Sequence, residues 1–298
     1  MTPGPAAPFG VRLWVAGARP RTLGASVSPV LVGTAVASRF GDVIWWRAVL
    51  ALVVSVALQV GVNYANDYSD GVRGVDTVKR KGPMRLTASG LVAPGAVKRA
   101  AFLAFGVAAV AGIVLAVAAD WRLILVGAAC VLAGWLYSGG PKPYASAGLG
   151  EVMVLVFFGF VATVGSTYVH DRRLPGLAFE AAVPMGLVAS AILLVNNLRD
   201  VLTDRVAGKR TLAVRLGEPT TRLIYLSCMA VAAVWPLLLG VTAPGAVVGL
   251  LAAPLAIVPM KTVARPDADA PALVGALVKT ARFQLALAAL LAVGLWDW

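Results

Sequence analysis

The sequence has few acidic residues and almost no histidine or cysteine. Only 14 Asp and Glu, one His and two Cys occur among its 298 residues. The single histidine, His170, excludes a histidine-rich metal centre. Cys130 and Cys228 lie in apolar runs, where a cysteine behaves as a small hydrophobic residue, so no disulfide framework is expected.

Charge of either sign is also scarce. Charged residues make up 13% of the chain and hydrophobic residues 59%, and the mean hydropathy is +0.84. A soluble fold must cover part of its surface with polar groups, and this composition cannot do so. We therefore expect an all-α integral membrane protein. Apolar runs with charges only near their ends predict about nine transmembrane helices, at 22–38, 47–66, 101–119, 122–138, 149–169, 179–198, 223–241, 244–262 and 278–296.

The few acids are concentrated in two short segments, at the ends of the second and sixth expected helices. Five of the 14 acidic residues lie there: Asp67, Asp70, Asp76, Asp200 and Asp204. The repeated placement predicts two pseudo-repeated four-helix halves plus one extra helix, around a central cavity. We expect residues 1–298 to form a single transmembrane domain.

The distribution of Lys and Arg predicts the orientation in the membrane. Of the 26 basic residues, 21 lie at the N-terminus, in the loops after the even-numbered expected helices, or at the helix ends beside those loops. The acidic segments lie on the same side. Cytoplasmic loops carry an excess of Lys and Arg, so the N-terminus and the opening of the cavity are expected on the cytoplasmic side of the inner membrane. This topology explains the net charge of +12 without a nucleic-acid partner. The opposite side holds Arg39, Arg47, Arg122, Arg172 and Arg173.

The spacing of the acids predicts a divalent cation. Asp67 and Asp70 are three residues apart, and Asp200 and Asp204 are four apart, so each pair projects from one face of a helix. Carboxylate oxygens suit Mg²⁺, which usually shares its coordination sphere with substrate phosphates. Two facing acidic surfaces therefore predict Mg²⁺ ions that hold a diphosphate.

A metal-bound diphosphate beside a membrane suits the departure of diphosphate from an allylic lipid. The cation neutralises the leaving group, and an apolar cavity shields the allylic cation from water. A transporter is the alternative from another class. It would place its ionisable residues deep within the spans, whereas the paired acids gather at the ends of the apolar runs.

Several stretches of the chain resemble the UbiA superfamily of intramembrane prenyltransferases, and within it the 1,4-dihydroxy-2-naphthoate polyprenyltransferases (the MenA branch). Asp76 follows Asp70 by six residues, which is similar to this branch and differs from the spacing of four usual in the 4-hydroxybenzoate branch. The matching stretches are 18–23, 63–76, 85–90, 137–144, 148–151 and 196–217.

The resemblance implies roles for particular residues. Tyr137 would lie near the reacting carbon, and Glu151 stays outside the site as a candidate structural partner of a nearby basic group. The implied metal ligands are Asp67, Asp70, Asp200 and Asp204, with Asn63 and Asp76. The implied substrate-binding residues are Arg19, Asn63, Asn66, Arg73, Lys142 and Asn197.

The resemblance also implies the reaction. It is the Mg²⁺-dependent transfer of a polyprenyl group from an allylic polyprenyl diphosphate to 1,4-dihydroxy-2-naphthoate, with decarboxylation, giving demethylmenaquinone. Another aromatic acceptor, such as 4-hydroxybenzoate or homogentisate, remains the alternative. The lipid bilayer is the expected environment.

Overall fold

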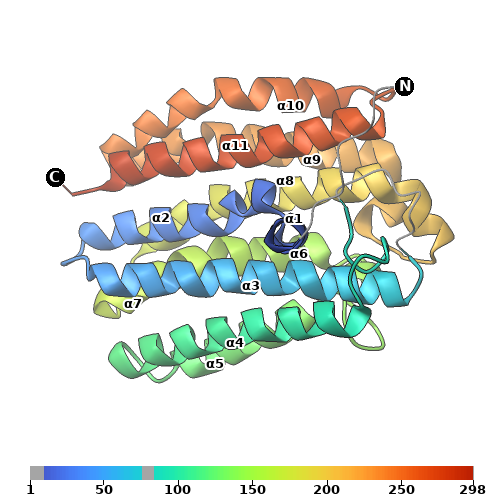
Figure 1. Cartoon of the computed structure of the whole chain (residues 1–298). Helices are drawn as coiled ribbons and strands as arrows, with labels where there is room; N and C mark the ends of the chain where they lie inside the picture. Colours follow the sequence, from blue (N-terminus) through green and yellow to red (C-terminus); the bar gives the residue numbers. More distant parts are fainter. Residues whose placement is uncertain (1–9, 76–83, 298) are drawn as a thin grey trace.

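A computed structural model describes residues 10–75 and 84–297, and within these ranges every regular element is a helix. The long helices run side by side, and successive ones point in opposite directions (Figure 1). The α-helices are α1 Val11–Ala18, α2 Gly24–Ser38, α3 Trp45–Val72, α4 Pro94–Ala118, α5 Leu123–Leu136, α6 Gly150–Val154, α7 Ala162–Asp171, α8 Gly176–Val206, α9 Leu212–Thr242, α10 Pro254–Ala264 and α11 Ala270–Leu295. The tighter or wider helical segments are η1 Pro20–Thr22, η2 Ala145–Ala147, η3 Leu155–Val161 and η4 Pro244–Ala252.

The long apolar helices confirm a multi-pass membrane protein. In the described part of the chain, six helices are long and apolar enough to cross a membrane: α3, α4, the continuous segment Gly150–Asp171, α8, α9 and α11. A seventh span results if η4 and α10, which meet at a bend of 48°, count as one. The expected spans 22–38 and 122–138 are present as the shorter apolar helices α2 and α5. The count of nine therefore stays a prediction.

Helices α3 and α8 extend beyond the apolar runs that predicted them. The run at 47–66 is part of a helix that continues to Val72, and the run at 179–198 is part of one that continues to Val206. Apolar patterning marks only the part of a helix that faces lipid or core, so the polar turns at the end escape it. Asp67, Asp70, Asp200 and Asp204 therefore lie on helices, as their spacing predicted. Gly74 and Gly208, both with positive φ, follow the two helix ends.

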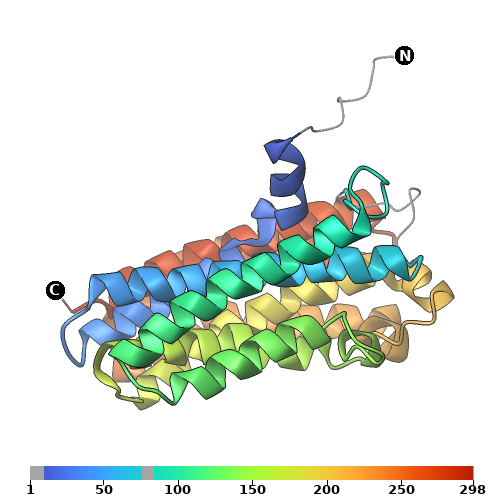
Figure 2. The same ribbon diagram turned by 60° about the horizontal axis from the view of Figure 1, so that its bottom comes forward.

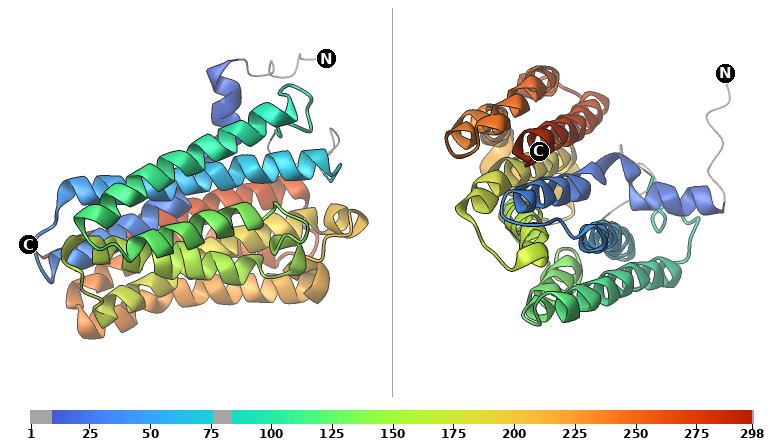
Figure 3. Two further views of the ribbon diagram at one scale, coloured as in Figure 1. Left: turned by 90° about the horizontal axis from the view of Figure 1, so that it is seen from below. Right: turned by 90° about the vertical axis from the view of Figure 1, so that its left-hand side faces the viewer.

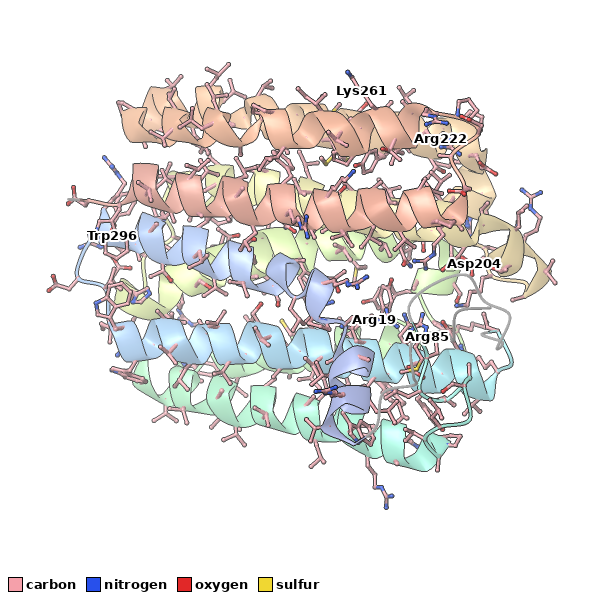
Figure 4. The ribbon with its side chains drawn as sticks, turned by 45° about the horizontal axis from the view of Figure 1, so that its top comes forward. Arg19, Arg85, Asp204, Arg222, Lys261 and Trp296 are labelled. Atoms are coloured by element: carbon pink, nitrogen blue, oxygen red, sulfur yellow. The ribbon has the colours of Figure 1, made fainter. Side chains whose placement is uncertain are left out.

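The C-terminal ends of α3 and α8 lie at the same end of the bundle, which we call the motif end. Figure 4 shows Arg19, Arg85 and Asp204 in the half of the molecule away from Trp296, which lies at the opposite end. Viewed along the helix axes, α4 and α5 lie on one side of the bundle and α10 and α11 on the other (Figure 3).

The buried core is divided unequally between these two sides. The larger cluster of buried side chains joins α2, α8, α9, α10 and α11 and includes Met185, Tyr225 and Phe283. A smaller cluster around Tyr64 and Phe105 joins α3 and α4. The most buried of the spans is α8, which has 72% of its apolar window inside the protein. Helix α3 of the smaller side packs on α2 and α7, which in turn pack on α8.

The short helix α1 stands out from the side of the bundle, at a steep angle to the long helices (Figure 2). The Trp14 ring meets the Tyr64 ring edge-on, with centroids 5.8 Å apart, and the Tyr64 hydroxyl donates to the Trp14 carbonyl. At Gly17 an added Cβ would lie only 2.6 Å from the Cδ1 of Leu86, so a glycine allows this close approach. Helix α1, α3 and the segment around Leu86 are therefore packed as one unit.

Candidate active site

One large cavity of about 1460 Å³ lies mainly between α3, α4, α5, α8 and the span 150–171. Along α3 its lining changes from Val54 and Leu58 to Asn63 and Asn66, and along α8 it changes from Ile192 and Leu193 to Asn196 and Arg199. Both helices run toward the motif end, so the polar lining is concentrated there. Within the described residues, all charged side chains that line the cavity are arginines: Arg19, Arg21, Arg85 and Arg199. A cavity that is apolar along its length and cationic at one end suits an anionic head on a hydrocarbon tail.

Arg19 enters the cavity wall from an unusual backbone position. It ends α1 with φ 57° and ψ 63°, in the left-handed region that few residues other than glycine adopt. Such conformations cost free energy and are concentrated at functional sites. The turn redirects the chain from α1 into η1, which also brings Arg21 to the cavity.

Asp67 connects α3 to the segment that follows the undescribed residues. The carboxylate is 1% exposed, and its two oxygens accept hydrogen bonds from the backbone amides of Leu86 and Thr87, at 2.8 and 2.9 Å. At Gly71, one turn further along α3, an added Cβ would lie 2.4 Å from the Cγ2 of Thr87. These contacts place Arg85 against the cavity.

Asp70 joins the first acidic segment to the second. Its Oδ1 lies 2.8 Å from the Nζ of Lys209, and both side chains are largely buried. The backbone amide of Lys209 in turn donates to the carbonyl of Asp204, at 2.9 Å. The two acidic segments therefore meet in space, although 133 residues separate Asp67 from Asp200. Asp76, the remaining predicted ligand, lies outside the described residues.

Arg199 is a cavity residue that the sequence analysis did not assign to the site. Its Nε and Nη2 donate to the two oxygens of Asp200 at 2.7 and 2.5 Å, and Nη2 also donates to Oδ1 of Asn196 at 2.8 Å. The guanidinium is thus held in a fixed fork while its side chain lines the cavity. Its position directly before Asp200, inside the second acidic segment, was the sequence feature that could have assigned Arg199 to the site.

The predicted asparagines divide into two groups. Asn63 and Asn66 line the cavity. Nδ2 of Asn63 donates to the carbonyl of Ala18 at 2.9 Å, and Oδ1 is the acceptor atom of this side chain for a cation. Asn197 does not line the cavity, and its Nδ2 donates to Oε1 of Glu151 at 2.8 Å. The partner of Glu151 is therefore an amide, which corrects the suggestion of a basic group.

Tyr137, Arg73 and Lys142 come from two adjoining segments at the motif end. Tyr137, directly after α5, lines the cavity, and its ring meets the Tyr144 ring edge-on, with centroids 5.6 Å apart. Arg73 donates to the carbonyls of Ser138 and Gly140, so it holds the turn after Tyr137 instead of lining the cavity. Lys142 is exposed on the same turn.

The donor set at the motif end fits Mg²⁺ in its chemistry. All the candidate ligands are carboxylate or amide oxygens, which this cation prefers. In residues 10–75 and 84–297, no three His, Cys, Asp or Glu side chains come together as a preformed metal cluster. The carboxylates of Asp67, Asp70 and Asp200 instead accept hydrogen bonds from the protein. A carboxylate has about four lone-pair sites, so the bonds to Asp67 and Asp70 leave positions for a cation.

The fold and the cavity define a helical membrane protein built to hold an amphiphilic anion, and comparison with known proteins identifies its class. The UbiA prenyltransferase family matches residues 26–280, so the chain belongs to this family and is a prenyltransferase. It is 50% identical over 244 residues to a Mycobacterium tuberculosis protein named 1,4-dihydroxy-2-naphthoate octaprenyltransferase, which covers 82% of this chain and 83% of that protein.

Solved structures of distant relatives share the fold. The apo structure of a UbiA homolog from Aeropyrum pernix K1 aligns with a TM-score of 0.67 at 17% identity, over 91% of this chain and 96% of that one. A UbiA homolog from Archaeoglobus fulgidus, bound to DMAPP and Mg²⁺, aligns with a TM-score of 0.64 at 15% identity, over 94% of this chain and 99% of that one.

Proposed function

We propose that the protein transfers a polyprenyl group from an allylic polyprenyl diphosphate to 1,4-dihydroxy-2-naphthoate. The observation that carries this proposal is the large cavity whose lining is apolar along α3 and α8 and whose charged lining residues, in the described part of the chain, are arginines. A polyprenyl diphosphate has the same division into a long apolar tail and an anionic head. The acceptor is inferred from the half-identical relative in Mycobacterium tuberculosis.

The arginines hold the diphosphate in this proposal. Arg19, Arg85 and Arg199 line the polar end of the cavity, and guanidinium groups bind phosphate oxygens through paired hydrogen bonds. Mg²⁺ held by Asp67, Asp70, Asp200 and Asp204, with Asn63 and Asp76 in support, would neutralise the charge that develops on the leaving diphosphate. The apolar wall keeps water away from the allylic carbon.

The bond changes balance without a protein nucleophile. The allylic carbon–oxygen bond breaks, and both electrons leave with the diphosphate. The ring carbon that carries the carboxylate forms the new carbon–carbon bond, and the carboxylate departs as carbon dioxide and returns its bonding electrons to the ring. The direct product is therefore the reduced, dihydroxy form of demethylmenaquinone, and formation of the quinone is a separate two-electron oxidation.

The orientation in the membrane is part of the same proposal. The excess of Lys and Arg on the side of the acidic segments supports a cytoplasmic motif end and a cytoplasmic N-terminus in the inner membrane. Donor and acceptor would then enter one domain, residues 1–298, from the cytoplasm and the inner leaflet.

The test is product formation by the purified protein in lipid nanodiscs. With dihydroxynaphthoate, an allylic polyprenyl diphosphate and Mg²⁺, we expect a product whose mass equals the prenylated ring less the carboxylate. A chelator should stop the reaction, and added Mg²⁺ should restore it. 4-Hydroxybenzoate and homogentisate, supplied in parallel, should react at least about 10-fold more slowly. Product from one of these acceptors and none from dihydroxynaphthoate would disprove the assignment.

A further inference from the structure

Glu151 is a buried carboxylate beside the cavity that the proposed mechanism does not use. It lies in the first turn of α6 and is 6% exposed. Its Oε1 accepts a hydrogen bond from Nδ2 of Asn197 at 2.8 Å, and its backbone carbonyl accepts one from Oγ of Ser190 at 2.9 Å. Glu151 therefore joins the start of α6 to the middle and the C-terminal part of α8.

The other carboxylate oxygen of Glu151 has no such partner. Oε2 is buried and makes no hydrogen bond within the described residues. A buried oxygen without a partner costs free energy whether the carboxyl group is ionised or protonated. Because native proteins satisfy nearly all of their buried polar atoms, this exception requires an explanation.

Tyr137 is a cavity residue with a hydroxyl group, which can donate the hydrogen bond that Oε2 of Glu151 lacks. Tyr137 lines the cavity at the end of α5. A Cβ built on Gly150, the residue before Glu151, would lie 3.8 Å from Cε2 of Tyr137, which is van der Waals contact. The start of α6 therefore lies directly against the Tyr137 ring.

We propose that Glu151 is a positioning residue for the aromatic acceptor. Oε1 holds the Asn197 amide, and Oε2 accepts a hydrogen bond from the Tyr137 hydroxyl when substrates fill the cavity. This fixes the Tyr137 ring as the surface against which the acceptor ring lies, facing the allylic carbon. The inference rests on the proposed function, since it assumes an aromatic acceptor at the polar end of the cavity.

The experiment compares steady-state kinetics of five proteins in nanodiscs: wild type, Glu151→Gln, Tyr137→Phe, the double variant and Ser190→Ala. Glutamine keeps an oxygen for Asn197 but presents an NH₂ group toward Tyr137, which cannot accept the hydroxyl proton. Glu151→Gln should lower kcat/KM for the acceptor by about 10- to 100-fold, the size expected from misplacement of a substrate, and leave KM for the prenyl diphosphate unchanged.

The double variant separates positioning from general damage. If Glu151 acts through Tyr137, adding Glu151→Gln to Tyr137→Phe should cost no more than about 2-fold beyond Tyr137→Phe alone. Ser190→Ala removes the hydrogen bond to the Glu151 backbone and keeps the carboxylate, so it should retain the wild-type rate. Thermal melting, followed by tryptophan fluorescence, should give similar midpoints for all five proteins.

Several outcomes would overturn the inference. These are wild-type kinetics for Glu151→Gln, losses that multiply in the double variant, an equal rise in KM for the prenyl diphosphate, or a Glu151→Gln protein that no longer folds, which would make the carboxylate structural. A wild-type protein that forms no prenylated product would instead overturn the proposed function itself.

Discussion

The two acidic segments have similar acids but different partners. On α3, Asp67 accepts hydrogen bonds from two backbone amides, which fixes the segment that carries Arg85. On α8, Asp200 accepts from the guanidinium of Arg199, which lines the cavity. The first segment therefore shapes the wall of the site, while the second places a positive charge in it. The two acidic segments are similar in sequence, but their aspartate side chains make different contacts.

This difference has an electrostatic consequence. The backbone amides that bind Asp67 carry no net charge, whereas Lys209 compensates the charge on Asp70 and Arg199 compensates the charge on Asp200. A divalent cation is attracted more strongly to the uncompensated carboxylate. We therefore expect Asp67 to contribute more to metal affinity than Asp200, and Arg199 to contribute to binding of the diphosphate.

The largest expected effect is on the metal requirement. Asp67→Asn should reduce prenyl transfer at a fixed Mg²⁺ concentration by more than about 100-fold, because a ligand charge is lost at the site of charge development. Asp200→Asn should reduce the rate by a similar factor but raise the half-saturating Mg²⁺ concentration less. Asp267→Asn, in an exposed ion pair with Arg265, is the matched control and should behave as wild type. If Asp67→Asn and Asp200→Asn have the same half-saturating Mg²⁺ concentration, Asp67 does not contribute more to metal affinity than Asp200.

A smaller effect is expected at Arg199. Arg199→Gln removes a guanidinium from the polar end of the cavity, so KM for the prenyl diphosphate should rise by about 10-fold, within the range expected for one charge-assisted contact. Arg265→Gln changes an exposed arginine in the same way and serves as the control. Unchanged KM in Arg199→Gln, measured with a fluorescent or radioactive donor, would place the diphosphate elsewhere.

The smallest effect is expected where α3 meets the segment around Thr87. Gly71→Ala would bring a Cβ within 2.4 Å of Cγ2 of Thr87, and relieving this overlap should destabilise the protein by about 1–3 kcal/mol. Gly106→Ala on α4, where an added Cβ meets nothing within 4 Å, is the control. Melting temperatures of the two variants check this prediction. Equal values would show that the segment around Thr87 moves away from α3 without loss of stability.

Much of the fold could be predicted from the sequence because its causes are local. Apolar runs mark the parts of helices that face lipid, and a spacing of three or four residues predicts that Asp67 and Asp70 share a helical face. The ends of the helices were predicted less well, since the polar final turns of α3 and α8 carry no apolar pattern.

The partners of the site residues could not be predicted, because they depend on contacts between distant segments. Lys209 reaches Asp70 across 139 residues, and nothing near either residue indicates the pairing. The predicted roles of Arg73 and Lys142 in binding the diphosphate stay untested, and neither residue lines the cavity. Arg73 points toward carbonyl groups of a neighbouring turn, a direction that loop sequence does not specify.

The central claim is that the ends of α3 and α8 together hold one lipid diphosphate. A structure of the protein in nanodiscs, with Mg²⁺ and an unreactive prenyl thiodiphosphate, tests it most directly. The account predicts the diphosphate at the motif end, in contact with Arg199 and with Mg²⁺ bound by Asp67 or Asp70 and by Asp200 or Asp204. A diphosphate found near Trp296, or Mg²⁺ held by one acidic segment without the other, would contradict it.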